Sequence, residues 1–258
     1  MYVDSHCHLD PQYYPEGGAD AALDRARLAG VSAFVAIGVG ADLARARHVA
    51  AVAAAQPDVW AAVGVHPHDA TSLDLASEEE LDSLARQARV VAVGEIGLDY
   101  HYMHSPREAQ HETFRRLVRL ARRVQKPIVI HTREAAEDTL RILDEEGARD
   151  VGGVIHCFSE DRPFAARALD LGFDLSFSGI VTFKSARAIQ EVAAWAPPER
   201  ILVETDSPYL APIPMRGKRC EPAFVVHTAR RVAELRGEAV EDLARRTSDN
   251  ARRLFRLG

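Results

Sequence analysis

The chain has few cysteines and no long apolar run, and these absences restrict its expected environment. Only Cys7, Cys157 and Cys220 occur among 258 residues, too few for a disulfide framework, so we expect a reducing compartment. The N-terminus lacks the charged lead-in and apolar segment of a signal peptide. No apolar run approaches the roughly 18 residues that predict a membrane span. We therefore expect a cytoplasmic protein without a membrane partner.

An excess of basic residues is also absent. The chain carries 32 Lys and Arg against 38 Asp and Glu, a formal net charge of −6. This excludes the overall basic field that is usual in nucleic-acid-binding proteins, so a polyanionic partner needs a local basic cluster or a bound cation. No exposed apolar stripe stands out, which slightly favours a monomer.

What the sequence contains is a regular alternation of short apolar runs and helical segments. The runs rich in β-branched residues are 2–9, 31–39, 59–67, 90–98, 127–132, 152–159, 173–179 and 201–208. Several are apolar on both faces, as strands covered on both sides by helices must be. With no linker or low-complexity tract in 1–258, the pattern predicts the α/β class and one (β/α)8 TIM-type barrel domain. A doubly wound open sheet is the alternative, but IGVGAD at 37–42 lacks the third glycine of its phosphate-binding turn.

Particular residues predict where helices begin and end. Ser105 and Ser77 are each followed three residues later by glutamate, which predicts capping boxes before helices over about 105–125 and 78–88. Asp42 is the expected cap of the alanine-rich helix before Pro57. Gly147 and Gly172 are expected to end two later helices in the left-handed conformation.

Imidazole and carboxylate side chains gather at the ends of the predicted strands. In a (β/α)8 barrel the carboxyl ends of all strands converge on the active-site face. One histidine on a strand is usually a packed core residue, but a buried carboxylate needs a cation or hydrogen-bond donors. Four histidines and two carboxylates at such positions predict a metal site. These residues are His6, His8, Glu95, His131, His156 and Asp206.

Six ligands exceed what one zinc ion takes from a protein, so we predict two divalent ions bridged by Glu95. Besides Glu95, the first ion would be bound by His6, His8 and Asp206. The second ion would be bound by Glu95, His131 and His156. Mixed imidazole and carboxylate ligation suits Zn, Mn, Fe or Ni better than Ca. Two ions about 3.5–4 Å apart lower the pKa of a bridging water and produce a hydroxide nucleophile. Asp206 is the predicted general base.

The period of two along a strand predicts which residues orient these ligands. Asp4 lies two residues before the first histidine and Glu204 two before Asp206, so both are expected to accept hydrogen bonds from ligating imidazoles. The alternative, a buried polar layer without a role at the metal, fits Glu204 better than Asp4. Cys7 and Cys157 are expected to point toward the helices as small buried hydrophobes.

Basic and aromatic residues near the predicted mouth are candidates for substrate contact. The candidates are Arg133, the RGKR residues Arg216, Lys218 and Arg219, and His66 after the third run. Arginine grips phosphate through two hydrogen bonds, and lysine acts as a point charge. Tyr209 or Tyr100 is expected to stack on a base.

The ordered motifs resemble those of a known family. DSHCHLD, GVHPH, GEIGLDY, SPRE, PIVIHTRE, HCFS, GIVTFK, ETDSPYLAP and RGKRCEPA are similar to the motif set of the TatD family of metal-dependent hydrolases, which are amidohydrolase-like (β/α)8 barrels. SDNARRLF resembles the family's closing helix, so the resemblance runs from residue 3 to about residue 255. It implies divalent metal ions at the same six ligands, with Zn, Mn, Mg, Ni or Fe as candidate metals. It also implies a deoxyribonuclease, typically a 3′→5′ exonuclease on single-stranded DNA.

Two other functions compete with the nuclease. Some relatives are described as acting on D-aminoacyl-tRNA, so a D-aminoacyl-tRNA deacylase, or another ester or amide hydrolase, is the alternative at the same two-metal centre. An open groove with basic rims would favour a polynucleotide, and a pocket shaped for an aminoacyl end would favour the deacylase. A non-catalytic metal-binding barrel is disfavoured because Glu95 and Asp206 are both present.

Overall fold

The computed structural model describes residues 1–15 and 17–258, in which strands and helices alternate. The strands are β1 (Tyr2–Cys7), β2 (Val31–Val39), β3 (Val59–Gly64), β4 (Val90–Asp99), β5 (Ile128–Arg133), β6 (Gly153–Ile155), β7 (Phe173–Phe177) and β8 (Ile201–Val203). The α-helices are α1 (Gly18–Leu28), α2 (Ala44–Ala55), α3 (Leu75–Ala85), α4 (Arg107–Val124), α5 (Ala136–Glu145), α6 (Arg162–Asp170), α7 (Arg187–Trp195), α8 (Val225–Arg236) and α9 (Val240–Phe255). The 3-10 helices are η1 (Pro11–Tyr13), η2 (Pro67–Ser72), η3 (Ala148–Asp150), η4 (Gly179–Thr182), η5 (Pro198–Arg200) and η6 (Pro222–Phe224).

The strands form one sheet in sequence order, from β1 to β8. The pairs are parallel, and Cys7 at the end of β1 also pairs in parallel with Ser207 after β8. Each strand therefore neighbours the next, and the last neighbours the first, which is the strand order of a (β/α)8 barrel. The predicted fold class is confirmed. Within the described ranges no helix is long and apolar enough to cross a membrane.

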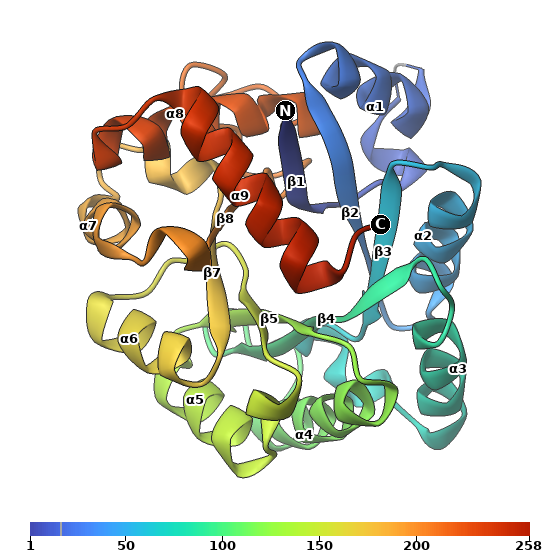
Figure 1. The fold of residues 1–258 in the computed structure, drawn as a ribbon. Helices are drawn as coiled ribbons and strands as arrows, with labels where there is room; N and C mark the ends of the chain where they lie inside the picture. The colour runs from blue at the N-terminus through green and yellow to red at the C-terminus, as the bar shows by residue number, and fades with distance from the viewer. Residues whose placement is uncertain (16) are drawn as a thin grey trace. The chain divides into compact units, whose positions relative to one another are not determined.

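Contacts divide the chain into two compact units. The first unit comprises Met1–Ala36, His156–Ala165 and Asp174–Gly258. In it α8 and α9 lie side by side, drawn in orange-red and red (Figure 1). Helix α9 also fixes strands, because Ser248 donates to the carbonyl of Met1 and Asn250 donates to the carbonyl of Ile201. The predicted single domain over 1–258 stays a prediction.

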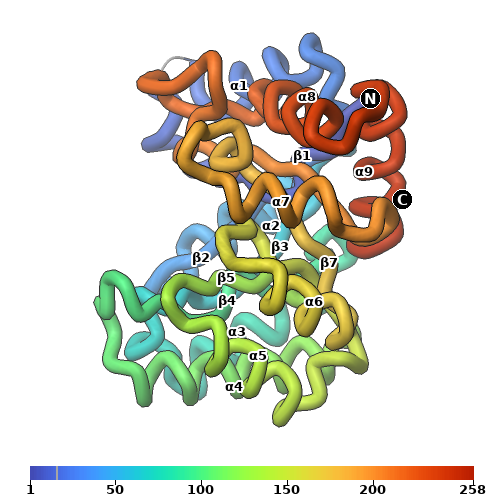
Figure 2. The backbone as a smooth tube through the Cα atoms, turned by 90° about the vertical axis from the view of Figure 1, so that its left-hand side faces the viewer, coloured from blue at the N-terminus to red at the C-terminus, as the bar shows by residue number. Residues whose placement is uncertain are grey.

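The second unit comprises Ile37–Ile155 and Ala166–Phe173. Strands β4 and β5 pair along most of their length and lie side by side (Figure 2). Gly97 in β4 has a φ of 142°, and a Cβ there would lie 1.9 Å from the carbonyl oxygen of His131. Only glycine therefore permits β5 to approach β4 so closely at this point.

Strands β6 and β8 end well before their apolar runs because polar residues redirect the backbone. Strand β8 stops at Val203, and the Asp206 that follows has a left-handed φ of 55° and donates its N–H to the carbonyl of His6. Strand β6 stops at Ile155, and Cys157 has a φ of 44°. The period of two therefore fails at Cys157, which is half-buried with its Sγ 3.2 Å from Ser178 Oγ, whereas Cys7 is fully buried as expected.

The helix caps are partly those expected. Gly147 and Gly172 are left-handed as expected, with φ of 66° and 89°. Asp42 accepts from the N–H of Ala44, but the residue at the cap position of α2 is Leu43, so Asp42 is not the predicted cap. The Ser105 prediction is wrong, because this buried hydroxyl donates to the carbonyl of His68 at 2.8 Å, and α4 begins at Arg107 without a side-chain cap. Helix α3 begins at Leu75 instead of about residue 78.

Candidate metal centre

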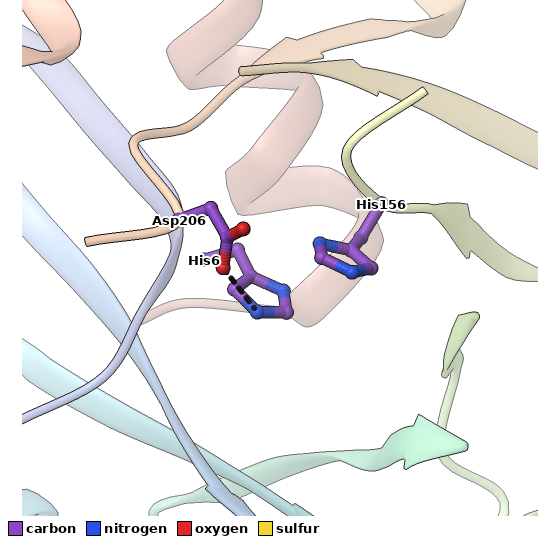
Figure 3. Close-up of side chains that lie close together, drawn as sticks. All are labelled: His6, His156 and Asp206. Atoms are coloured by element: carbon purple, nitrogen blue, oxygen red, sulfur yellow. Dashed lines mark ion pairs between the residues drawn. The ribbon is translucent and has the colours of Figure 1, made fainter. Parts of the chain in front are cut away.

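The first unit brings His6, His156 and Asp206 together, as Figure 3 shows. One ligand atom from each of the three lies within 4.8 Å of the others. His6 Nε2 lies 3.6 Å from Asp206 Oδ1, and the rings of His6 and His156 stack at 3.9 Å between centroids. His6 is fully buried and Asp206 is 9% exposed, so their polar atoms face one another away from bulk water.

His8 joins the same carboxylate. Its Nε2 lies 3.5 Å from Asp206 Oδ1, and its backbone N–H donates to the carbonyl of Ser207. The pairing of β1 with the segment after β8 thus sets His6 and His8 around one carboxylate oxygen. The prediction that the HCH motif faces Asp206 agrees with this geometry.

Glu204 orients His156. Glu204 Oε1 lies 3.1 Å from His156 Nδ1 and accepts the backbone N–H of Cys157 at 2.8 Å. Since a carboxylate only accepts, the imidazole donates from Nδ1, and its Nε2 keeps a lone pair for a metal ion. Glu204 therefore makes the contact predicted for an orienting residue.

Asp4 contacts the backbone and not a histidine ring. It accepts from the N–H of Thr205 at 2.9 Å, from its hydroxyl at 2.6 Å, and from the N–H of His6 at 3.4 Å. Complete burial raises the pKa of Asp4 to about 8. These contacts fix the strand that carries His6, which differs from the expected hydrogen bond to an imidazole.

The second unit brings His66, Glu95 and His131 together, again with one ligand atom from each within 4.8 Å of the others. His131 Nδ1 lies 2.9 Å and His66 Nε2 3.5 Å from Glu95 Oε1. Glu95 is buried inside β4, at an irregularity of the β4–β5 register between Gly94 and Ile96. An extra residue of this kind re-aims a side chain, which explains how a strand of apolar residues presents one carboxylate to two imidazoles.

Asp99 completes this cluster, and the sequence analysis missed it. Its Oδ2 lies 3.1 Å from His131 Nε2 and 3.1 Å from His68 Nε2. Burial alone would raise the pKa of Asp99, but hydrogen bonds from His131, the N–H of Tyr102 and His68 hold it well below its usual range. The period of two that was applied to Asp4 would have pointed from Glu95 to Asp99.

His131 lies between two carboxylates, and this placement suits a cation. Since Asp99 accepts from Nε2, the lone pair of Nδ1 faces Glu95 Oε1, another acceptor, at 2.9 Å. Either a second proton or a metal ion satisfies both acceptors. Imidazole nitrogen together with carboxylate oxygen is the ligand set that Zn, Mn, Fe and Ni share, so the residues of both units fit divalent metal ions.

His66 has the features of a neutral hydrogen-bond donor. Its Nδ1 accepts the backbone N–H of His68 at 3.1 Å, which leaves the proton on Nε2. Burial lowers the pKa of His66 to about 4, with Glu95 opposing this effect, so the ring is uncharged at neutral pH. This tautomer agrees with its predicted contact to substrate better than with metal ligation.

The RGKR residues and Tyr209 lie in loops after β8, and Arg133 is the exposed last residue of β5. Arg216, Lys218 and Arg219 are exposed after β8, where Arg219 donates to the carbonyl of Tyr13 at 2.6 Å. Tyr209 is 49% exposed, with its ring 6.0 Å from that of His8.

Tyr100 is engaged elsewhere. Its hydroxyl lies 2.5 Å from His111 Nε2 and donates to Asp138, and the guanidinium of Arg107 covers its ring at 4.0 Å. These contacts disagree with its expected stacking on a base.

Comparison with known proteins adds the family. The model of the family described as TatD related DNase matches residues 3–256. The chain belongs to the TatD family. It is 44% identical to the "uncharacterized metal-dependent hydrolase YcfH" of Escherichia coli over 99% of this chain and 96% of that protein. It is 36% identical to the "3'-5' ssDNA/RNA exonuclease TatD" of Pantoea vagans, over 90% of this chain and 91% of that protein.

A solved structure agrees with the fold. The TatD homologue YJJV of Escherichia coli matches with a TM-score of 0.89 at 28% identity, over 99% of this chain and 98% of that one. The chain is thus a metal-dependent hydrolase of the TatD family with a (β/α)8 fold.

Proposed function

We propose that this TatD protein is a deoxyribonuclease that removes nucleotides from the 3′ end of single-stranded DNA. The residues that would hold two divalent ions are His6, His8, Glu95, His131, His156 and Asp206. The observation that carries this proposal is the presence of two groups of imidazole and carboxylate donors, each drawn together within its own unit. The exonuclease name of the Pantoea vagans relative supports the choice of substrate.

The side chains have separate tasks. Bound divalent ions supply a water of lowered pKa and positive charge for the phosphoryl oxygens. Asp206, whose Oδ1 faces His6 and His8, accepts the proton of the attacking water. His66 donates a hydrogen bond from Nε2 to a phosphoryl oxygen, which an uncharged imidazole can do across the neutral pH range.

The exposed basic residues after β8 support a phosphate-bearing substrate. The net charge of −6 repels a polyanion at long range, so attraction has to be local. Arg216 and Lys218 are exposed in the same loop segment that follows Asp206. They hold the backbone of the DNA strand through charge-assisted contacts.

The test is hydrolysis by protein freed of metal with a chelator, with Mg, Mn or Zn then added back. The substrates are single-stranded DNA labelled at its 3′ end, the same DNA labelled at its 5′ end, and a D-aminoacyl-tRNA. We expect metal-dependent release of labelled mononucleotide from the 3′ label and gradual shortening of the 5′-labelled strand. Asp206→Asn should lower the rate by about 100-fold or more, the usual contribution of a general base.

Asp24→Asn is the matched control, because Asp24 is exposed on α1 and forms an ion pair with Arg27 on the same helix. It should hydrolyse DNA at the wild-type rate. Intact DNA together with a discharged aminoacyl ester would assign the same ligands to a deacylase. Absence of hydrolysis of all substrates would contradict a catalytic metal centre.

A further inference from the structure

The loop between β4 and α4, residues 100–106, exposes several side-chain rings. They lie beside the candidate metal ligands His66, Glu95 and His131. His101, Tyr102, Met103 and His104 are all exposed, and Tyr102 is 52% exposed. We propose that Tyr102 is the stacking surface for a base of a single-stranded nucleic acid. This inference rests on the proposed nuclease function and names a binding residue for it.

The loop is held in place at both ends, so the ring of Tyr102 is presented in one position. Asp99 Oδ1 accepts the N–H groups of His101 at 3.0 Å and Tyr102 at 2.8 Å. The buried Gln110 accepts from the N–H of Asp99 and donates to the carbonyls of Asp99 and Ser105. A surface ordered before binding loses less conformational entropy when a ligand stacks on it.

The backbone of the loop turns two rings to the same side. Met103, between Tyr102 and His104, has a left-handed φ of 50°. The rings of Tyr102 and His104 are nearly parallel, at 10° and 5.6 Å between centroids. Left-handed non-glycine residues are costly and gather at ligand sites, so this turn is better explained by the ring pair that it creates than by the needs of a loop.

The rings lie close to the predicted metal ligand His131. The ring of His68 is 6.4 Å from that of His131, 5.5 Å from that of Tyr102 and 4.6 Å from that of His104. Asp99 joins the two ends of this series, since its Oδ2 contacts His131 and its Oδ1 holds the backbone of Tyr102. A base on Tyr102 therefore belongs to a nucleotide near the scissile phosphate.

Arg133 already shows that the ring accepts a flat, delocalised group. Its exposed guanidinium lies 4.7 Å from the centroid of Tyr102. Every base has a π-face of the same kind, so stacking on a tyrosine is tolerant of sequence. A base entering the site takes the place of the guanidinium on the ring, and Arg133 then binds the adjoining phosphate. A ligand that replaces the guanidinium on the ring and then binds it needs both an aromatic group and a nearby negative charge. A nucleotide has both.

The test compares two oligonucleotides that differ in one base. One is single-stranded DNA with natural 3′-terminal nucleotides, and the other carries abasic sugars at its last two positions. For Tyr102→Ala we expect a KM on the natural strand raised between about 5-fold and 150-fold, the range that stacking of one base supports. Its KM on the abasic strand should equal that of the wild type. Tyr102→Phe, which keeps the ring, should retain the preference for the natural strand.

Leu75→Ala is the matched control, since Leu75 is an apolar residue 77% exposed in the same unit and outside the loop. An equal loss on both strands, or no loss on either, would overturn the stacking role while leaving the nuclease function intact. Failure of the wild type to cleave either strand would instead overturn the nuclease function.

A second readout is independent of hydrolysis. Fluorescence of 2-aminopurine at the 3′ end, measured with chelator-treated protein, should be quenched by the wild type and less by Tyr102→Ala. Equal quenching by the two proteins would overturn the inference whatever the outcome of the hydrolysis assay.

Discussion

At the scale of single residues, the two acidic groups predicted to orient ligands make different contacts. Glu204 contacts the ring of His156, whereas Asp4 holds the backbone around His6 and Thr205. Carboxylates hydrogen-bonded to ligating imidazoles fix their tautomer and strengthen them as ligands. Glu204 and Asp4 should therefore respond differently to substitution.

Glu204→Gln should lower the affinity for Zn or Mn by about 10- to 100-fold, because a neutral amide oxygen is a weaker acceptor for the Nδ1–H of His156 than the carboxylate and makes the imidazole a weaker ligand. Titration calorimetry on chelator-treated protein measures this change. Asp4→Asn is the comparison, and it should leave the affinity within a few-fold of the wild type. An unchanged affinity in Glu204→Gln would refute the orienting role.

The sequence predicts that imidazoles and carboxylates lie at the strand ends. It does not predict which of these side chains contact one another. The positions of His6, His8 and Asp206 follow from parallel strands whose carboxyl ends converge. The period of two from Glu95 points to Asp99, but its partners could not be predicted, because two histidines from different segments meet on its Oδ2. The tautomer of His66 depends likewise on a backbone N–H that only the folded loop supplies.

At the scale of strands and helices, apolar runs located every strand but extended beyond the ends of five. Four of these, the runs beginning at residues 2, 59, 152 and 201, continue into polar residues that belong to the site. After several of these strands, side chains replace the neighbouring strand as hydrogen-bond partners. Thr205 donating to Asp4 just after β8 is one example. Strand ends near a functional site are therefore the part of the fold that periodicity predicts least well.

The close approach of β4 and β5 yields a prediction for Gly97→Ala. Its Cβ would lie 1.9 Å from the carbonyl of His131, so β5 has to move or the protein unfolds. We expect loss of metal binding and a destabilisation of more than about 3 kcal/mol, larger than most single substitutions cause.

Gly172→Ala is the control for backbone strain alone. Gly172 also has a left-handed φ, of 89°, but no atom lies within 4 Å of the added Cβ. It should cost about 1 kcal/mol and leave metal binding unchanged. Denaturant unfolding and calorimetry measure both quantities, and equal effects of the two substitutions would contradict the steric explanation.

The start of α3 yields a second prediction at this scale. Asp74 Oδ1 accepts the N–H of Ser77 at 2.8 Å, and Ser77 Oγ accepts the N–H of Asp74 at 2.9 Å, a reciprocal capping box. Ser77 is thus the third residue of the helix and not its cap, which explains the misplaced boundary. Asp74→Ala should destabilise the protein by about 1 kcal/mol in urea unfolding. The exposed Glu79→Ala in the same helix should change stability by less than about 0.5 kcal/mol.

At the scale of the whole molecule, charge determines how a substrate strand is attracted. Because the net charge is −6, the attraction of DNA has to come from local basic side chains. Binding of single-stranded DNA should therefore weaken as the salt concentration rises. Lys218→Ala should reduce the slope of log affinity against log salt by about 0.7, the value for one phosphate contact on a single strand. Arg245→Ala, an exposed cation on α9 paired with Asp242, should leave the slope unchanged. Fluorescence anisotropy at several salt concentrations measures the slopes, and a wild-type slope in Lys218→Ala would remove this residue from the interface.

The central claim is that imidazoles and carboxylates from strand ends hold two divalent ions. The most direct test is the number of ions bound per chain, measured by elemental analysis after equilibrium dialysis against Mn or Zn. We predict two ions for the wild type and a clear reduction for Glu95→Gln, which removes the negative charge of the proposed bridging ligand. A wild-type protein that binds no ion, or a Glu95→Gln variant that binds as many ions as the wild type with equal affinity, would contradict the account.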